Sequence, residues 1–286
     1  HFNGAWVRVI GENGDAEGRR RGVYQGSPRY DYDILAIQAG TDAYAVERDD
    51  GVRDHAGFYL GQGRMRSDVI HYDGTLAGRN EVRATSLGLY WTRYWEEGQY
   101  LDAVWQGSWG KGKSRSSNGL LLDRDTFGWG VSLEGGYPFR QEDDDTQVFE
   151  PQAQVIYQRI KKGNNADPAG LVRFENKGSL AAPLGLRWAD TWTLEPPDAG
   201  IRRLFSGWLR LNVWHEFRGQ PVTEFSSADG YVPFKADLKG TWWQLNAGMT
   251  WQLGASTSAY ANIGYQKRFE RTFDAWDAKV GMRWNW

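Results

Sequence analysis

The chain has no cysteine and is poor in several other residue types. Its 286 residues include no Cys, 9 Pro, 3 Met and 4 His. The lack of Cys excludes disulfides and every metal site built on thiolate ligands. The formal net charge is -2, so no excess of positive charge predicts a nucleic-acid partner. Because His1, His55, His71 and His215 have no metal-ligand spacing, we expect neither a metal nor a cofactor.

Long apolar runs are also missing. No stretch approaches the roughly 18–20 apolar residues that a membrane-spanning helix needs, and the mean hydropathy is -0.66. By this criterion the protein is soluble, but the criterion does not detect membrane β-barrels. The strands of such barrels alternate apolar and polar residues, so their hydropathy averages out. A soluble all-β sandwich or barrel and a membrane barrel therefore both remain open.

What the chain does contain is a recurring strand pattern, rich in Gly (36) and Trp (16). Runs with apolar and polar residues in alternation, as in a β-strand, are separated by turns or polar connections. Twelve runs are expected, over residues 4–12, 30–46, 55–66, 81–96, 100–113, 125–139, 147–161, 180–193, 204–217, 240–253, 256–269 and 273–286.

The length and composition of these runs favour a membrane barrel. Most have about 9–14 residues, whereas strands of soluble proteins average about 5–6. Aromatic residues near the run ends are typical of the girdles at the two membrane interfaces. They include Trp91, Trp95, Trp105, Trp109, Trp188, Trp243, Trp251, Trp284 and Trp286.

The connections between the runs alternate in length. Long polar connections are expected over residues 13–29, 67–80, 114–124, 162–179 and 218–239, and most of those between them are short turns. Membrane barrels place short turns on the periplasmic side and long loops outside. Both termini are therefore expected in the periplasm, with the first strand closing on the twelfth. Because the 218–239 connection contains Phe225, Tyr231 and Phe234, it is expected to fold over the barrel mouth or back into the lumen.

The last eight residues, 279–286, combine a charged face with an apolar face. Lys279, Gly281 and Arg283 lie on the first, while Trp284 and Trp286 belong to the second. A soluble protein gains little from ending on an exposed Trp, but a membrane barrel gains an aromatic anchor. The segment also fits the terminal assembly signal of outer-membrane barrels, through Lys279, Gly281, Trp284 and Trp286.

Several segments resemble one family. The sequence EPQAQ at residues 150–154 resembles a strand of the translocator domains of type V secretion autotransporters, especially the AIDA-type branch. Residues 3–8 resemble the first barrel strand of that family, and residues 259–265 are similar to its penultimate strand. The resemblance covers essentially the whole chain.

The resemblance implies a 12-stranded, antiparallel, up-and-down transmembrane β-barrel in the outer membrane of a Gram-negative bacterium. Its function would be to anchor and export an N-terminal passenger domain to the cell surface. In the family a helix lies in the pore upstream of the first strand, and we expect that helix and the passenger to be absent from residues 1–286. The implied partners are outer-membrane lipids, the passenger and pore helix, the barrel assembly machinery and periplasmic chaperones. We expect a monomer.

A stand-alone outer-membrane pore or adhesin barrel is the alternative. An outer-membrane protease or esterase is disfavoured, because no Ser lies in a nucleophile-elbow motif such as G-x-S-x-G. The sequence upstream of His1 discriminates between the first two functions, since a repetitive passenger there would indicate a translocator.

Charged and amide side chains are expected on the inner face of the barrel, where they would contact the pore helix or form a stiffening ion-pair lattice. These are Arg8, Asp102, Glu134, Glu150, Gln152, Gln154, Arg187, Arg210, Glu216, Asp277, Lys279 and Arg283. Some family members cut their own linker with lumenal acidic residues. Glu134 and Glu150, on neighbouring strands, are the candidates for such a single-turnover cleavage, although the chain is otherwise not expected to be an enzyme.

Overall fold

A computed structural model describes most of the chain. The described residues are 4–17, 29–141, 144–162, 165–167, 170–175, 178–194, 203–219, 222–227, 230–235, 239–270 and 272–286. Their regular secondary structure consists of β-strands. Among these residues there is no helix with the length and apolar character needed to cross a membrane.

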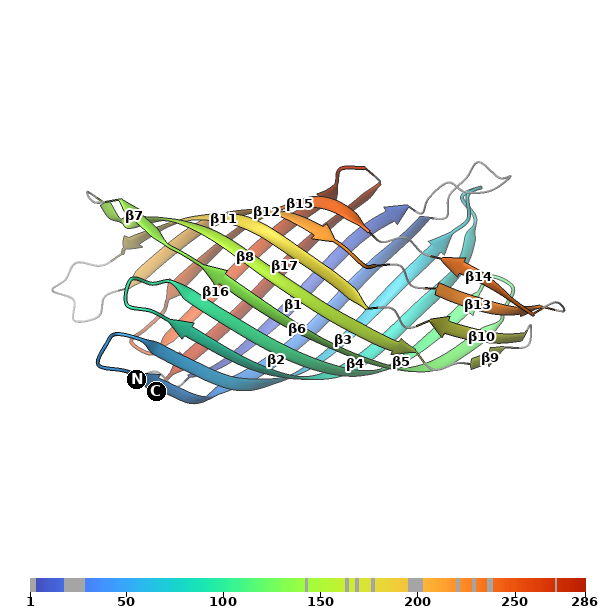
Figure 1. The fold of residues 1–286 in the computed structure, drawn as a ribbon, viewed down its shortest axis with the longest axis horizontal. Coiled ribbons are helices and arrows are strands. Elements are labelled where there is room, and N and C mark those ends of the chain that lie inside the picture. Colours follow the sequence, from blue (N-terminus) through green and yellow to red (C-terminus); the bar gives the residue numbers. More distant parts are fainter. Residues whose placement is uncertain are drawn as a thin grey trace.

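Twelve antiparallel strands form a closed barrel (Figure 1). Each strand pairs with the next, β8 pairs with β11, and β17 pairs with β1 to close the ring. The strands are β1 Gly4–Glu17, β2 Arg29–Glu47, β3 Arg53–Ile70, β4 Leu76–Tyr94, β5 Tyr100–Ser116, β6 Leu121–Gly136, β8 Asp144–Lys162, β11 Ser179–Thr193, β12 Leu204–Glu216, β15 Gly240–Gln252, β16 Thr257–Arg268 and β17 Phe273–Asn285. The twelve expected strands and the closure of the first on the last are confirmed.

Five short strands accompany the barrel. One of them, β7 (Phe139–Gln141), pairs with the start of β8. The other four form a separate sheet in the order β14-β13-β10-β9. Their bounds are β9 Asn165–Asp167, β10 Gly170–Glu175, β13 Val222–Ser227 and β14 Gly230–Lys235. This sheet lies at the end of the barrel away from the termini (Figure 1). The expectation that the 218–239 connection folds over the barrel mouth or back into the lumen depends on the side chains of Phe225, Tyr231 and Phe234, which lie outside what the structure describes.

Two of the expected long loops are wrong. Strand β3 continues to Ile70 and β4 begins at Leu76, so the connection predicted over 67–80 is mostly strand. The connection predicted over 114–124 is likewise shortened, because β5 ends at Ser116 and β6 begins at Leu121. Gly74 (φ 85°) and Gly119 (φ 83°) supply the left-handed backbone conformation of the two tight turns.

The reason for this error is the height of the strands. A 19-residue strand such as β4 is about 60 Å long at roughly 3.3 Å per residue, whereas the apolar band of a membrane barrel is only roughly 25 Å tall. Even when tilted, such strands extend well beyond that band. Their outer parts have polar side chains on both faces because both faces meet water, and this polarity resembles that of a loop in the sequence.

The outward face of the barrel is apolar and exposed. Leu184 is 69% exposed, Val280 59% and Leu60 58%. A soluble protein would cover such a surface, since large contiguous apolar patches are rare on soluble monomers. The inward face is polar and holds the site described next.

Candidate functional site in the lumen

Side chains from strands that are not neighbours meet inside the barrel. Arg210 Nη2 of β12 lies 3.2 Å from Glu134 Oε2 of β6, although β8 and β11 separate these strands in the sheet. Tyr59 of β3 donates to Gln106 Oε1 of β5 over 2.7 Å, across β4. Because the outer surface of a barrel diverges, contacts that skip strands can form only on its inner side. The polar faces of the strands therefore line the lumen.

Two carboxylates form the centre of the lumenal cluster. Tyr100 OH donates to Glu134 Oε1 over 2.6 Å, and Gln152 Nε2 donates to Tyr100 OH over 3.0 Å. Gln152 Nε2 also lies 2.5 Å from Glu150 Oε1, to which it donates. Glu150 and Gln152 are buried, with 8% and 7% exposure. Tyr100 and Gln152 together thus link the two acidic residues that the sequence singled out.

Two arginines face this pair of carboxylates. Arg210 contacts Glu134, as described above, and Arg187 Nη1 lies 3.8 Å from Glu150 Oε1. The Arg187 guanidinium also lies 5.8 Å from the Trp208 ring centroid, within the range of a cation–π contact. A cavity of about 330 Å³ opens beside them. Its lining residues are Tyr94, Gly98, Tyr100, Glu150, Gln152, Arg187, Trp208 and Arg210.

The local sequence explains how these residues are presented. In the EPQAQ segment of β8 the period of 2 places Glu150, Gln152 and Gln154 on one face and Pro151 on the other. Glu150 is paired in register with Arg187 of β11, and Gln154 with Glu134 of β6. The opposite charges of Glu150 and Arg187 therefore face each other directly across the adjacent strands β8 and β11.

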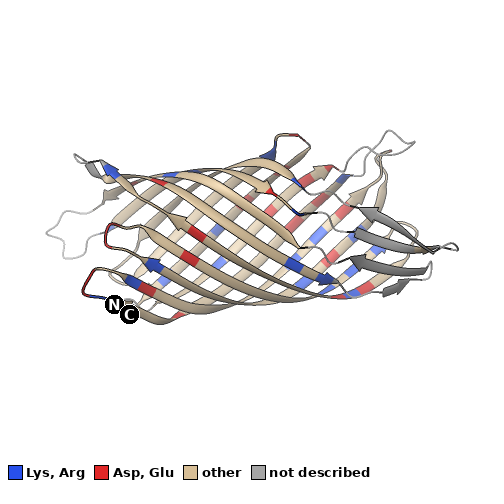
Figure 2. Ribbon diagram, viewed as in Figure 1, with Lys and Arg blue, Asp and Glu red and all other residues tan. Residues whose placement is uncertain are grey.

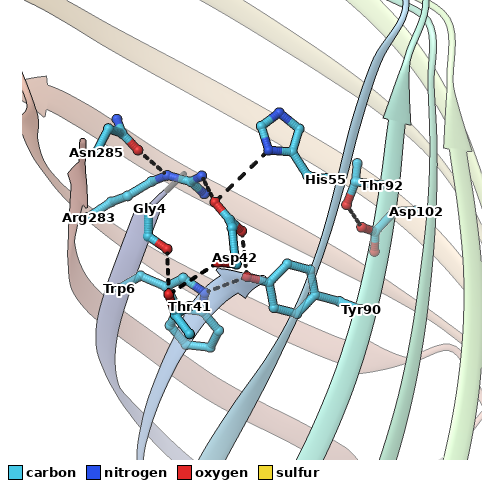
Figure 3. A network of polar contacts seen from close by, with 10 residues as sticks. All are labelled: Gly4, Trp6, Thr41, Asp42, His55, Tyr90, Thr92, Asp102, Arg283 and Asn285. Carbon is cyan, nitrogen blue, oxygen red and sulfur yellow. Dashed lines mark hydrogen bonds and ion pairs between the residues drawn. The ribbon is translucent and has the colours of Figure 1, made fainter. Parts of the chain in front are cut away.

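A second cluster lies near the chain termini (Figure 3). Arg283 Nη2 of β17 is 2.7 Å from Asp42 Oδ2 of β2, and Tyr90 OH of β4 donates to Asp42 Oδ1 over 2.6 Å. His55 Nδ1 lies 4.0 Å from Asp42 Oδ2. Arg283 Nε also donates to Asn285 Oδ1 over 2.9 Å. This cluster joins four strands around the point where the barrel closes.

Several other candidate residues on the inner face have partners on adjacent strands or one strand further away. Arg8 Nε donates to Gln38 Oε1 over 2.7 Å, and the hydroxyl of Thr92 donates to Asp102. Gln244 Nε2 donates to Asp277 Oδ1 over 3.5 Å. Lys279 lies on the same face of β17 as Asp277 and Arg283. These residues follow the barrel wall and are not gathered at the Glu134–Glu150 cluster.

Glu216 has a different environment. It is the last residue of β12, and its Oε1 accepts hydrogen bonds from the amides of Leu180, Arg218 and Gly219, each over 2.9 Å. Its Oε2 accepts a hydrogen bond from Ser179. These contacts attach the end of β12 to the start of β11. The carboxylate is thus engaged in holding the strand ends together.

The sequence reasoning missed Asp42, Tyr90 and Tyr100. Tyr100 shares a face with Asp102, and this alternation could have revealed it. Asp42 gave a weaker signal, because a register irregularity between Asp42 and Tyr44 interrupts the alternation of β2. The contact of Asp42 with Arg283 joins residues 241 positions apart, which no local pattern reports.

The terminal strand β17 pairs with β1 along its whole length, from Gly4 with Asn285 to Ala16 with Phe273. The outward side chains Val280 (59%) and Trp284 (38%) of β17 are exposed, as is Trp286 (57%), which follows the strand. On the inward face the ring of Tyr260 covers Gly281, where a Cβ atom would overlap the ring.

Comparison with known proteins identifies relatives of this barrel. A family model described as autotransporter beta-domain matches residues 5–264. The pertactin autotransporter of Bordetella parapertussis is 28% identical over 289 residues, which cover 99% of this chain and 28% of that protein. The chain therefore spans less than a third of the length of this curated relative.

Two solved structures share the fold. The beta domain of the Bordetella autotransporter BrkA is 23% identical, with a TM-score of 0.75 and complete coverage of both chains. The transport unit of the autotransporter AIDA-I from Escherichia coli is 15% identical, with a TM-score of 0.78 over 99% of this chain and 90% of that one. At these identities the likeness establishes the fold alone.

Proposed function

This chain belongs to the autotransporter beta-domain family, and from this premise we propose that its charged lumen holds the segment that links the barrel to a passenger. The barrel resides in the outer membrane of a Gram-negative bacterium and serves the export of a passenger domain. Domains of this family are transport barrels and not enzymes.

The observation that carries the lumenal role is the paired arrangement of Glu134, Glu150, Arg187 and Arg210 beside a cavity of about 330 Å³. A segment in the pore must have its own polar groups satisfied, because buried unpaired charges are costly. The site holds two carboxylates and two guanidinium groups. These groups can therefore exchange their ion pairs with one another for ion pairs with basic or acidic side chains of the linker. The same four residues also stiffen the empty barrel, and the two roles are compatible.

The proposal includes the direction of insertion. Both termini lie in the periplasm, and the passenger and a pore helix precede β1 in the full protein. The terminal strand, with Lys279, Gly281, Trp284 and Trp286, is the segment recognised by the barrel assembly machinery after periplasmic chaperones deliver the chain. The mature barrel works as a monomer in contact with outer-membrane lipids.

Self-cleavage of the linker is a second proposal for the same residues, and the contacts favour it less. A general base needs a carboxylate that is free to take a proton. Glu134 already accepts from Tyr100 and Arg210, and Glu150 accepts from Gln152. Positioning of the linker therefore fits the observed contacts better than proton transfer does.

One experiment tests both proposals. Glu150→Gln and Arg187→Gln are introduced into a full-length chain that includes linker and passenger, with Arg79→Gln on the outer face as the matched control. We expect both lumenal variants to fold, as judged by heat-dependent migration in gels, but to display less passenger on the cell surface. Unchanged display in both variants would overturn the linker-holding role. Loss of linker cleavage in Glu150→Gln with normal display would instead favour self-cleavage.

Because the chain has no Cys, thiol labelling of single-cysteine variants can measure the orientation of the barrel in the membrane. Single cysteines in the turns at opposite ends, Ser117→Cys and Asp49→Cys, introduce one thiol each. We expect a membrane-impermeant maleimide to label the first in intact cells and the second only after the outer membrane is permeabilised. The reverse labelling would overturn the periplasmic location of the termini.

A further inference from the structure

A large groove lies on the outward face of strands β1 to β8. Its volume is about 1540 Å³. Leu35 (45% exposed), Ile37 (51%) and Trp109 (50%) form its apolar part. These residues belong to the outward set, because Gln38 and Gln106 alternate with them along β2 and β5 and make the lumenal contacts described above. The groove therefore faces the membrane and not the pore.

Basic side chains line the part of the groove farther from the termini. Arg64, Arg83, Lys111, Lys113 and Lys161 contribute to it, whereas its acidic lining residues are Glu81 and Asp125. Basic positions, interleaved with acidic ones, lie on the barrel strands toward the end opposite the termini (Figure 2). The groove thus combines an apolar floor with a positively charged rim.

Three of these cations lie in one row across adjacent strands. Arg64 of β3 is directly opposite Arg83 of β4, and Arg83 is directly opposite Lys111 of β5. Directly opposed residues on one face have Cβ atoms only about 4.5–5.5 Å apart, and like charges at such positions are destabilising. A row of this kind is unfavourable unless an anion lies over it.

The described acidic residues neutralise this row only in part. Arg83 Nε lies 2.7 Å from Glu81 Oε1, with 74% and 36% of the two side chains exposed. Among the described residues, no ion pair joins Arg64 or Lys111 to a carboxylate, although Lys111 lies directly opposite Asp125 of β6. With Glu81 beside Arg83 and Asp125 opposite Lys111, the row keeps an excess of positive charge that an external anion can neutralise.

We propose that this groove binds a phosphorylated lipid of the surrounding outer leaflet, with its phosphate at Arg64, Arg83 and Lys111 and its acyl chains on Leu35, Ile37 and Trp109. The assignment to the outer leaflet rests on the proposed periplasmic location of the termini. Arginine and lysine suit a phosphate because they provide charge-assisted hydrogen bonds. The apolar floor adjoins the cationic row, as the acyl chains adjoin the headgroup in a lipid.

The same three strands offer a matched control. Arg66, Arg79 and Arg115 also face outward on β3, β4 and β5, closer to the turns and away from the apolar floor. They are paired in register with acidic partners or with one another, and Arg79 Nε lies 3.3 Å from Asp68 Oδ1. Replacing these three with Gln removes the same charge from the same strands.

The test compares the complete barrel, the triple variant Arg64→Gln/Arg83→Gln/Lys111→Gln, and the control triple variant. Each is purified in detergent, checked for folding by heat-dependent gel migration, and titrated with diphosphorylated lipid A by native mass spectrometry. We expect the first triple variant to bind at least about tenfold more weakly, equivalent to about 1.4 kcal/mol, and the control to bind like the unmodified barrel. Lipid A without phosphate should bind the unmodified barrel as weakly as diphosphorylated lipid A binds the first triple variant.

Three results would overturn the proposal. Equal losses in both triple variants would mean general charge attraction, and equal binding of lipid A with and without phosphate would mean apolar adsorption. Binding of inorganic phosphate alone at the same affinity as lipid A would assign the site to free phosphate and not to a lipid. These measurements in detergent do not depend on passenger export, so their failure is separate from failure of the proposed function. The cysteine labelling tests the leaflet on its own.

Discussion

Arg283 Nη2 of the last strand lies 2.7 Å from Asp42 Oδ2 of the second strand, and the ion pair crosses the first strand inside the barrel. The Asp42 side chain is only 1% exposed, while that of Arg283 is 37% exposed. Tyr90 OH donates to the other carboxylate oxygen over 2.6 Å. The backbone pairing of β17 with β1 is thus reinforced by a side-chain contact that reaches one strand further (Figure 3).

Removing the guanidinium should weaken barrel closure. In Arg283→Ala the buried Asp42 carboxylate keeps Tyr90 but loses its cationic partner, and such a loss costs about 1–3 kcal/mol. We expect a lower midpoint temperature for the change from the fast-migrating folded form to the slow-migrating unfolded form in gels. Arg79→Ala is the control, because its ion pair with Asp68 is exposed (69% and 46%) and such pairs contribute little. Equal midpoints for the two variants would contradict this role of Arg283.

The glycine of the terminal segment should be intolerant of a side chain. A Cβ atom on Gly281 would overlap the ring of Tyr260, whereas nothing lies within 4 Å of a Cβ on Gly11, in the partner strand of the same seam. Forcing a methyl group into a filled space costs typically about 1–3 kcal/mol. We expect Gly281→Ala to fold more slowly into detergent or lipid and Gly11→Ala to fold normally. A Cβ on Gly281 would also lie 2.7 Å from the backbone oxygen of Val7 in β1. Normal folding of Gly281→Ala would therefore contradict the tight packing of the Tyr260 ring and the β1 backbone around this glycine.

The turn between β3 and β4 should loosen in acid. Asp73 Oδ1 accepts hydrogen bonds from the Thr75 amide over 2.9 Å and from its hydroxyl over 2.6 Å. These bonds hold the pKa of Asp73 below its usual value, and the bond from the Thr75 hydroxyl contributes the most. A lowered pKa stabilises the turn while the carboxylate is ionised, and this stabilisation is lost as the pH falls through the lowered pKa.

Amide hydrogen exchange at Thr75 measures this effect. The protection factor should be independent of pH near neutrality and should fall only below the usual carboxyl range. In Asp73→Ala the amide should be unprotected at every pH. A protection factor in the unmodified protein that does not change down to strongly acidic pH would exclude Asp73 as the group that orders this turn.

The strand pattern could be read from the sequence because it depends on local alternation. The membrane location could be read from the length of the runs and from the aromatic residues near their ends. The lipid-facing side of each strand can be recognised from that strand alone. In β15, for example, the apolar residues Trp243, Leu245 and Ala247 alternate with Gln244 and Asn246. The same alternation placed Glu134 and Glu150 on the inner side of their strands, and it could have added Tyr100. The third and fifth connections were misread because strands that extend into water lose the alternation.

What the sequence determined by itself is the number of barrel strands, their faces, the terminal signal and the resemblance to a family. Only the closed barrel decided which inward side chains meet, since contacts such as Arg210 with Glu134 join positions 76 residues apart and depend on curvature and register. The same is true outside, where the row of Arg64, Arg83 and Lys111 exists only because the register of β3, β4 and β5 aligns them. Alternation is a property of one strand, whereas a cluster of charges is a property of several strands held side by side.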